Sequence, residues 1–163
     1  MPVFVHLTPA RYVQRIRKSG IKRGQRGVFC LPVLPNYHVS HQWLRELKRR
    51  GQRTIVAIHF RLGSEEEVWV GRYNEPHQQV TAGVAIAIIM RASDAQGYEV
   101  IIPHSISPSA IHRVRFAPQI VGWRYMPNAH QRKACLCPWC IRGDIKSQRL
   151  KRYYEKREKA EAP

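Results

Sequence analysis

The stretch Gly97-Tyr-Glu-Val-Ile-Ile-Pro-His104 opens with one carboxylate, Glu99, at the head of an apolar run. The β-branched residues at 100–102 favour a buried strand, and Pro103 ends it because proline has no backbone N–H to donate to a sheet. A polar turn then leads to a second short apolar segment at 111–114. An acid at the mouth of such a strand is either a half-exposed residue paired with an arginine or a functional carboxylate.

The composition is strongly basic. The 163 residues include 28 Lys and Arg against 11 Asp and Glu, which gives a net charge of +17. Such a surplus favours polyanionic partners, either nucleic acid or phosphate-bearing small molecules, although a host with a generally basic proteome would produce the same balance. The charge is spread along the chain, which predicts contact with RNA or DNA over a broad face.

The sequence predicts one main domain in the cytoplasm and no membrane partner. No apolar run approaches the roughly 18 residues of a membrane span, and the N-terminus lacks the basic and apolar regions of a secretory signal. We expect a domain over residues 1–127, a cysteine cluster over 128–145 that packs on it, and a charged helical tail over 146–163.

Hydrophobic periodicity and turn residues predict an α+β fold. The alanines of 81–92 favour a helix and its isoleucines favour a strand; we interpret it as a buried helix capped by Thr81. Val68–Val70 is expected to be the antiparallel partner of the strand at 54–62. The other expected elements are a strand at 2–7, a helix begun by Thr8 and closed by Gly20, a strand at 28–31, a helix at 41–50 capped by Ser40, the strand of Glu99, and strands at 111–114 and 119–125.

Three short motifs stand in order along these elements: Val5-His6-Leu7-Thr8 on the first strand, Gly27-Val28-Phe29 before the helix of Trp43, and Tyr98-Glu99-Val100. Together they resemble the ADP-ribosyltransferase family over residues 3–125. That family has a split antiparallel sheet with flanking helices and an NAD cleft between the two halves. Its first strand supplies a histidine, its second region an aromatic or hydroxyl residue, and a later strand the catalytic glutamate.

The resemblance implies a role for each matched residue. Glu99 would be the catalytic carboxylate. NAD would be held by His6, Leu7, Thr8, Phe29, Tyr37 and Trp43, with His6 donating to a ribose and the aromatic residues stacking on nicotinamide. Arg11, Arg23 or Arg26 would bind the pyrophosphate. Without the resemblance, His6 reads as structural, Phe29 and Trp43 as core, and Tyr37 as a surface residue.

Two positions depart from the family pattern. The second strand lacks a Ser-Thr-Ser motif, so Phe29 or Tyr37 would have to serve as the aromatic residue. Gly97 stands where members that modify arginine carry a second glutamate. A single glutamate, taken with the positive charge, favours a nucleic-acid acceptor.

The segment Ala134-Cys-Leu-Cys-Pro-Trp-Cys140 brings three thiols into one tight turn. A structural zinc site takes four ligands, and Cys135, Cys137 and Cys140 supply three. Cys30 is the expected fourth, with His130 as the second choice and His104 or His112 still open. The alternatives are a Cys-x-x-Cys redox dithiol and unpaired reduced cysteines.

The resemblance implies a mono-ADP-ribosyltransferase that uses NAD as substrate. The cysteines predict structural zinc, and the charge favours RNA or DNA as the acceptor. Such a protein would be a toxin or defence effector, and a protein antitoxin would be a possible partner. The alternative is a non-enzymatic, zinc-stabilised nucleic-acid-binding protein. The related RNA 2′-phosphotransferases are a third possibility, although the Arg-His-Arg-Arg pattern expected of them is not evident.

Overall fold

The computed structural model describes residues 1–117, which belong to one compact unit. The strand predicted at 119–125, the cysteine cluster, the charged tail and both predicted domain boundaries lie outside the described residues. Within residues 1–117, no helix is long and apolar enough to cross a membrane.

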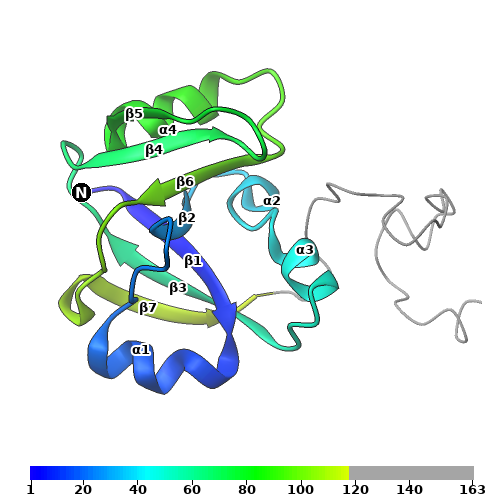
Figure 1. The fold of residues 1–163 in the computed structure, drawn as a ribbon, viewed down its shortest axis with the longest axis vertical. Helices are drawn as coiled ribbons and strands as arrows, with labels where there is room; N and C mark the ends of the chain where they lie inside the picture. Colours follow the sequence, from blue (N-terminus) through cyan, green and yellow to red (C-terminus); the bar gives the residue numbers. More distant parts are fainter. Residues whose placement is uncertain (118–163) are drawn as a thin grey trace, which may run out of the picture. The chain divides into compact units, whose positions relative to one another are not determined.

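The described chain is a mixed α+β fold built on a seven-stranded antiparallel sheet (Figure 1). The order across the sheet is β5-β4-β6-β2-β1-β3-β7, so β1 and β2 lie near its middle. The strands are β1 (Val3–Pro9), β2 (Val28–Pro32), β3 (Ile55–Arg61), β4 (Glu67–Arg72), β5 (Gln78–Thr81), β6 (Tyr98–Ile102) and β7 (Ile111–Phe116). The predicted α+β class is confirmed.

Pairing is weakest where β1 meets β2. The two strands pair at two positions, Phe4 with Pro32 and Val5 with Leu31, whereas β1 pairs with β3 along its whole length. Beyond Val5 the side chain of His6 spans the gap, with Nδ1 at 2.7 Å from the carbonyl oxygen of Phe29. The sheet therefore opens at its centre, because no backbone ladder joins the two strands past that point.

The strand β4 does not pair with β3, so that prediction is wrong. It pairs instead with β5 and β6, in the other half of the sheet. The reason lies in the β3–β4 connection. The carbonyl groups of Ser64 and Glu66 accept the N–H groups of Gly83 and Ala82, and the start of a helix thereby directs β4 away from β3.

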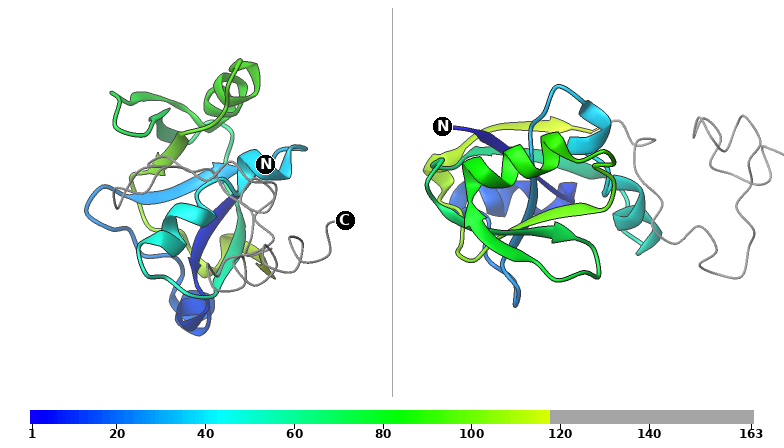
Figure 2. Two further views of the ribbon diagram at one scale, coloured as in Figure 1. Left: turned by 90° about the vertical axis from the view of Figure 1, so that its right-hand side faces the viewer. Right: turned by 90° about the horizontal axis from the view of Figure 1, so that it is seen from above.

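That helix is α4 (Ala82–Arg91), and its prediction is confirmed. Thr81 caps it, accepting the N–H of Val84 at 3.4 Å. The buried residues Ala82, Ala85 and Ile89 form a stripe at helical spacing, and Val84 and Met90 are exposed on the other side. Figures 1 and 2 show α4 running beside β4 and β5, which it contacts.

Two predicted helix starts are wrong. Pairing with β3 keeps β1 extended through Pro9, so Thr8 lies in the strand and does not cap. A 3-10 turn η1 (Ala10–Tyr12) then enters α1 (Val13–Ser19), which Gly20 closes as predicted with φ of 76°. Ser40 ends α2 (Tyr37–Ser40) and accepts the N–H of Leu34 at 2.9 Å, while α3 (Leu44–Arg49) begins later.

The second apolar segment after Glu99 is confirmed as β7, which follows the 3-10 turn η2 (Pro108–Ala110). β7 lies at one edge of the sheet described for residues 1–117. Its side chains at His112, Arg113, Arg115 and Phe116 are exposed. A row of cations along an edge strand discourages pairing with another strand and leaves the charge in solvent.

Candidate active site

A cavity of about 380 Å³ lies at the opening between β1 and β2. Its lining includes His6 and Leu7 from β1, Phe29 from β2, Trp43 from the residue before α3, and Glu99 from β6. The volume falls within the range of small-molecule sites, roughly 300–1,000 Å³. Five of the residues that the sequence singled out for one site therefore face one cavity, although they come from four separate segments.

Two of the predicted residues lie elsewhere. Thr8 is buried where β1 pairs with Val56 of β3. Tyr37 is exposed at 39% and stacks on His41, with the ring centroids 3.8 Å apart. Neither side chain lines the cavity, because one is held between strands and the other packs within its own helical segment.

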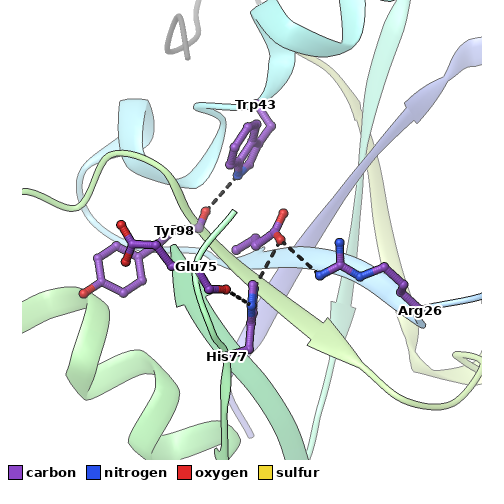
Figure 3. A network of polar contacts seen from close by, with 6 residues as sticks. Arg26, Trp43, Glu75, His77 and Tyr98 are labelled. Carbon is purple, nitrogen blue, oxygen red and sulfur yellow. Dashed lines mark hydrogen bonds and ion pairs between the residues drawn. The ribbon is translucent and has the colours of Figure 1, made fainter. Parts of the chain in front are cut away.

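Glu99 is a buried carboxylate of the cavity, exposed at 6%. Its Oε1 lies 3.1 Å from Nε2 of His77 and 3.9 Å from a guanidinium nitrogen of Arg26 (Figure 3). Burial raises the pKa of Glu99 above its usual value, since the charged form loses water. The positive charges of His77, Arg26 and Arg50 oppose that rise.

His77 reaches Glu99 from the connection between β4 and β5. Its Nδ1 donates to the carbonyl oxygen of Glu75 at 3.0 Å, and its side chain is 9% exposed. Gly71 of β4 lies directly opposite Glu99 in the sheet register. A Cβ on Gly71 would lie 2.9 Å from Cγ of His77 and 3.0 Å from the carbonyl oxygen of Pro76. The absence of a side chain at position 71 makes room for the imidazole beside Glu99.

The segment before α3 holds the start of β6 in place. Nε1 of Trp43 donates to the carbonyl oxygen of Tyr98 at 2.8 Å (Figure 3). Gln42 donates to the carbonyl oxygen of Ala95 at 3.0 Å and accepts the N–H of Gly97 at 2.6 Å. These bonds fix the backbone on the N-terminal side of Glu99, so the carboxylate enters the cavity from a rigid support.

The geometry of His6 differs from the expected donor role. A carbonyl oxygen can only accept, so the 2.7 Å contact with Phe29 requires a hydrogen on Nδ1. Loss of water lowers the pKa of His6, an effect larger than the opposing hydrogen bond to Phe29. The ring is therefore neutral near pH 7, and its Nε2 offers a lone pair that would accept a hydrogen bond.

Three arginines line the cavity: Arg26, Arg49 and Arg50. Arg26 is one of the three arginines that the sequence predicts at the pyrophosphate. The other two predicted residues, Arg11 and Arg23, make contacts elsewhere. Arg11 contacts the ring and hydroxyl of Tyr12, and Arg23 donates to the carbonyl oxygen of Pro103 at 3.3 Å. The cavity thus combines aromatic faces with guanidinium groups, a pairing suited to a ligand with rings and phosphates.

A second buried carboxylate, Glu46 of α3, lines the same cavity at 5% exposure. Its Oε2 pairs with Nε of Arg49 at 2.7 Å. Its Oε1 is buried and has no hydrogen-bond partner within residues 1–117. A buried acceptor left unpaired is costly, which makes Glu46 a candidate contact for a hydrogen-bond donor on a ligand.

Sequence reasoning missed His77, Glu46, Arg49 and Arg50. In the sequence, Glu46 and Arg49 have the spacing of an ordinary surface ion pair on a helix, and His77 stands in a loop without a pattern. Only the fold brings these side chains to Glu99 and His6. No sequence signal would have separated them from the many other charged residues of this basic chain.

Of the four cysteines predicted to bind zinc, one lies within residues 1–117. Cys30 is a buried, unpaired cysteine that lines the cavity, and burial raises the pKa of its thiol far above the usual range. Cys135, Cys137, Cys140 and the second choice His130 lie outside the described residues. Within residues 1–117 no group of three possible metal ligands is found, so the zinc site stays a prediction.

No family model matches this sequence, and the searches of curated proteins and of solved structures found no match to the chain.

Proposed function

We propose that the protein is a mono-ADP-ribosyltransferase that binds NAD in the cavity between β1 and β2 and uses Glu99 as its catalytic residue. One observation carries the proposal: His6, Phe29, Trp43 and Glu99 line a single cavity at the point where the central strands separate. In the antiparallel α+β fold described above, this is the arrangement that the resemblance implied for its NAD cleft.

The reaction suits a buried carboxylate. The bond between nicotinamide and C1 of the ribose breaks, and its electron pair leaves with nicotinamide, which becomes neutral. Positive charge develops on the ribose, and a fixed negative charge nearby stabilises that transition state. A nucleophilic O–H or N–H of the acceptor then bonds to C1 and gives up its proton, which Glu99 can accept.

The other lining residues suit the rest of NAD. Phe29 is 39% exposed and offers a ring face for nicotinamide or adenine. Arg26, Arg49 and Arg50 match the pyrophosphate in charge and geometry. The lone pair on Nε2 of His6 would accept a hydrogen bond from a ribose hydroxyl, in place of the donor role expected from the resemblance.

The proposed acceptor is RNA or DNA. Support comes from the net charge of +17 and from the exposed cations Arg113 and Arg115 on β7. In this proposal the protein acts in the cytoplasm as a toxin or defence effector, and a protein antitoxin would inhibit it. Structural zinc belongs to the same proposal.

The test measures nicotinamide release from NAD, and transfer of labelled ADP-ribose, with RNA, DNA or neither present. Glu99→Gln should lower the rate by about two orders of magnitude or more, since it removes the stabilising charge. Glu66→Gln is the matched control, because the Glu66 side chain is 42% exposed and pairs with His104 away from the cavity lining. A Glu99→Gln protein as active as the parent would refute the proposal.

The exposed β7 cations also favour the second candidate function, binding of nucleic acid without catalysis. A protein of that kind would bind polynucleotide with an affinity that falls steeply as salt is raised. It would release no nicotinamide from NAD under any condition. The assay above therefore separates the two functions when the binding and turnover measurements are made on the same preparation.

A further inference from the structure

His77 and Glu99 form a close contact, and one hydrogen on the His77 ring can be located from its hydrogen bond. A carbonyl oxygen has no hydrogen to give, so the bond between His77 Nδ1 and the Glu75 carbonyl places one hydrogen on Nδ1. Nε2 on the other side of the ring lies 3.1 Å from Oε1 of Glu99. A hydrogen on Nε2 would be attracted to the carboxylate oxygen at that distance, whereas an unprotonated Nε2 would be repelled by it.

An attractive contact between the two groups therefore needs a second proton, held by one of them. It sits either on Nε2, giving an imidazolium beside a carboxylate, or on Oε1, giving two neutral groups. Arg26 at 3.9 Å and Arg50 both act on Glu99 as positive charges. Their charge favours the carboxylate form of Glu99, whereas burial favours its protonated form and is the larger effect on its pKa.

The contact is built into the fold. The imidazole lies over Gly71, the β4 residue paired with Glu99, and a side chain there would overlap it. The imidazole is 9% exposed and the Glu99 side chain 8% exposed, so water does not compete strongly for the pair. Nε2 and Oε1 are close but are not aligned as a hydrogen bond within residues 1–117.

Both positive contacts fall on the same oxygen. His77 and Arg26 each approach Oε1 of Glu99 (Figure 3). A carboxylate whose one oxygen is held from two sides cannot rotate freely about its last bond. The second oxygen, Oε2, is then presented in one direction, which is the requirement for a carboxylate that must meet a ribose or an acceptor hydroxyl in a fixed geometry.

We propose that His77 is a positioning residue for Glu99: its imidazole ring holds Oε1 and leaves Oε2 to act on the ligand. The inference rests on the proposed function for its consequence in catalysis, but the held carboxylate is a property of the protein without ligand. The charged groups that face Glu99 are His77 from the β4–β5 connection, Arg26 from the loop before β2, and Arg50 from the end of α3.

The primary experiment needs no turnover. The carbon-13 signal of the Glu99 carboxyl group, assigned by its loss in Glu99→Gln, is followed against pH in the unliganded protein. In His77→Gln the neutral amide removes the nearest positive charge, so Glu99 should titrate at a higher pH than in the parent. His104→Gln is the matched control, since it removes an exposed histidine from another glutamate, and it should leave the Glu99 signal unchanged.

Gly71→Ala gives an independent route to the same result. It alters neither member of the pair, but the added Cβ displaces the imidazole from its position over β4. The Glu99 signal should again move to a higher pH. If Glu99 titrates at the parent pH in both His77→Gln and Gly71→Ala, His77 does not hold the carboxylate and the inference is wrong.

The activity measurement adds the catalytic consequence. In His77→Gln, kcat should fall roughly tenfold or more, the scale of one charge-assisted hydrogen bond, with a smaller change in KM. The acid limb of the pH–rate profile should move to higher pH together with the Glu99 signal. A protein that shows the NMR shift but never releases nicotinamide supports the positioning role and contradicts the proposed function, so the two failures are distinguishable. A kcat equal to that of the parent, in an active enzyme, would contradict the catalytic part.

Discussion

Within residues 1–117, two histidine–glutamate pairs have nearly the same separation and very different surroundings. His77 and Glu99 approach to 3.1 Å with side chains 9% and 8% exposed. His104 and Glu66 approach to 3.0 Å with side chains 51% and 42% exposed. The residue types and the distance are shared, but the pairs differ in access to water and in alignment, since only the exposed pair is a hydrogen bond.

Access to water sets how strongly each pair affects stability and pKa. The exposed pair is solvated with or without its partner, and such pairs contribute about 0–1 kcal/mol to stability. The buried pair has lost most of its water, so each charge depends on its neighbours and the pKa of Glu99 is raised despite three nearby cations. A carboxylate in that state is a candidate for catalysis, because perturbed groups gather at functional sites.

The largest stability effect is expected from the glycines beside the two pairs. Gly71→Ala would place a Cβ 3.0 Å from the backbone oxygen of Pro76 and 2.9 Å from His77, so rigid groups must move. We expect a loss of about 1–3 kcal/mol in the free energy of unfolding, typical of overpacking. Gly63→Ala is the control, since its Cβ would meet the flexible side chain of Glu66 at 3.3 Å.

Denaturant unfolding of both variants measures the difference. Gly63→Ala should change the free energy of unfolding by less than about 0.5 kcal/mol, as surface substitutions do. Equal losses in the two variants would mean that the buried pair is no more tightly packed than the exposed one.

A smaller effect, on binding, is expected from the third carboxylate considered above, Glu46. Glu46 lines the cavity, and its Oε1 is buried without a hydrogen-bond partner within the described part of the chain. Glu46→Gln should weaken binding of NAD or ADP-ribose about tenfold, the scale of one hydrogen bond to a charged group. Isothermal titration calorimetry measures it, with Glu67→Gln on the exposed part of β4 as the control. Unchanged affinity in Glu46→Gln would place the ligand away from α3.

The change of the free energy of unfolding with pH is a further test of the buried pair, because the raised pKa of Glu99 predicts its direction. Because the pKa of Glu99 is raised in the folded state, the folded protein binds this proton more tightly than the unfolded chain does. Its contribution to stability is therefore present at low pH and is lost as pH rises through the folded pKa. Relative to Glu99→Gln, the parent should become less stable with rising pH across that window. Parallel curves of unfolding free energy against pH for the two proteins would contradict the raised pKa.

The sequence predicted some local features, although the helix starts expected at Thr8 and Ser40 are wrong. Thr81 caps α4 and Gly20 closes α1 because a helix end depends on a few neighbouring residues, and those are visible in the sequence. The strand of Glu99 was equally clear, since β-branched residues precede a proline. The prediction that His6, Phe29 and Glu99 share one site rests on the order of three motifs along the sequence. None of the three residues would have indicated it alone.

The sequence could not reveal long-range pairing. β4 was expected beside β3 because the two are consecutive, yet hydrogen bonds from the start of α4 to the β3–β4 connection send β4 to β6. β5 is short and polar, with the sequence Gln-Gln-Val-Thr, so it carries no strand signal. Without the β4–β5–β6 arrangement, nothing in the sequence places His77 beside Glu99, and the buried pair stays invisible.

The smallest expected effect concerns the exposed pair. His104→Gln should lower the free energy of unfolding by less than about 1 kcal/mol at low salt, because both side chains remain solvated. About 1 M salt shortens the screening length to roughly 3 Å and should remove most of that difference. The buried pair is shielded from ions by the protein, so the displacement of the Glu99 titration in His77→Gln should persist in the same salt. If salt abolished both effects alike, the separation between the buried and exposed pairs would fail, and His77 would be an ordinary surface partner of Glu99.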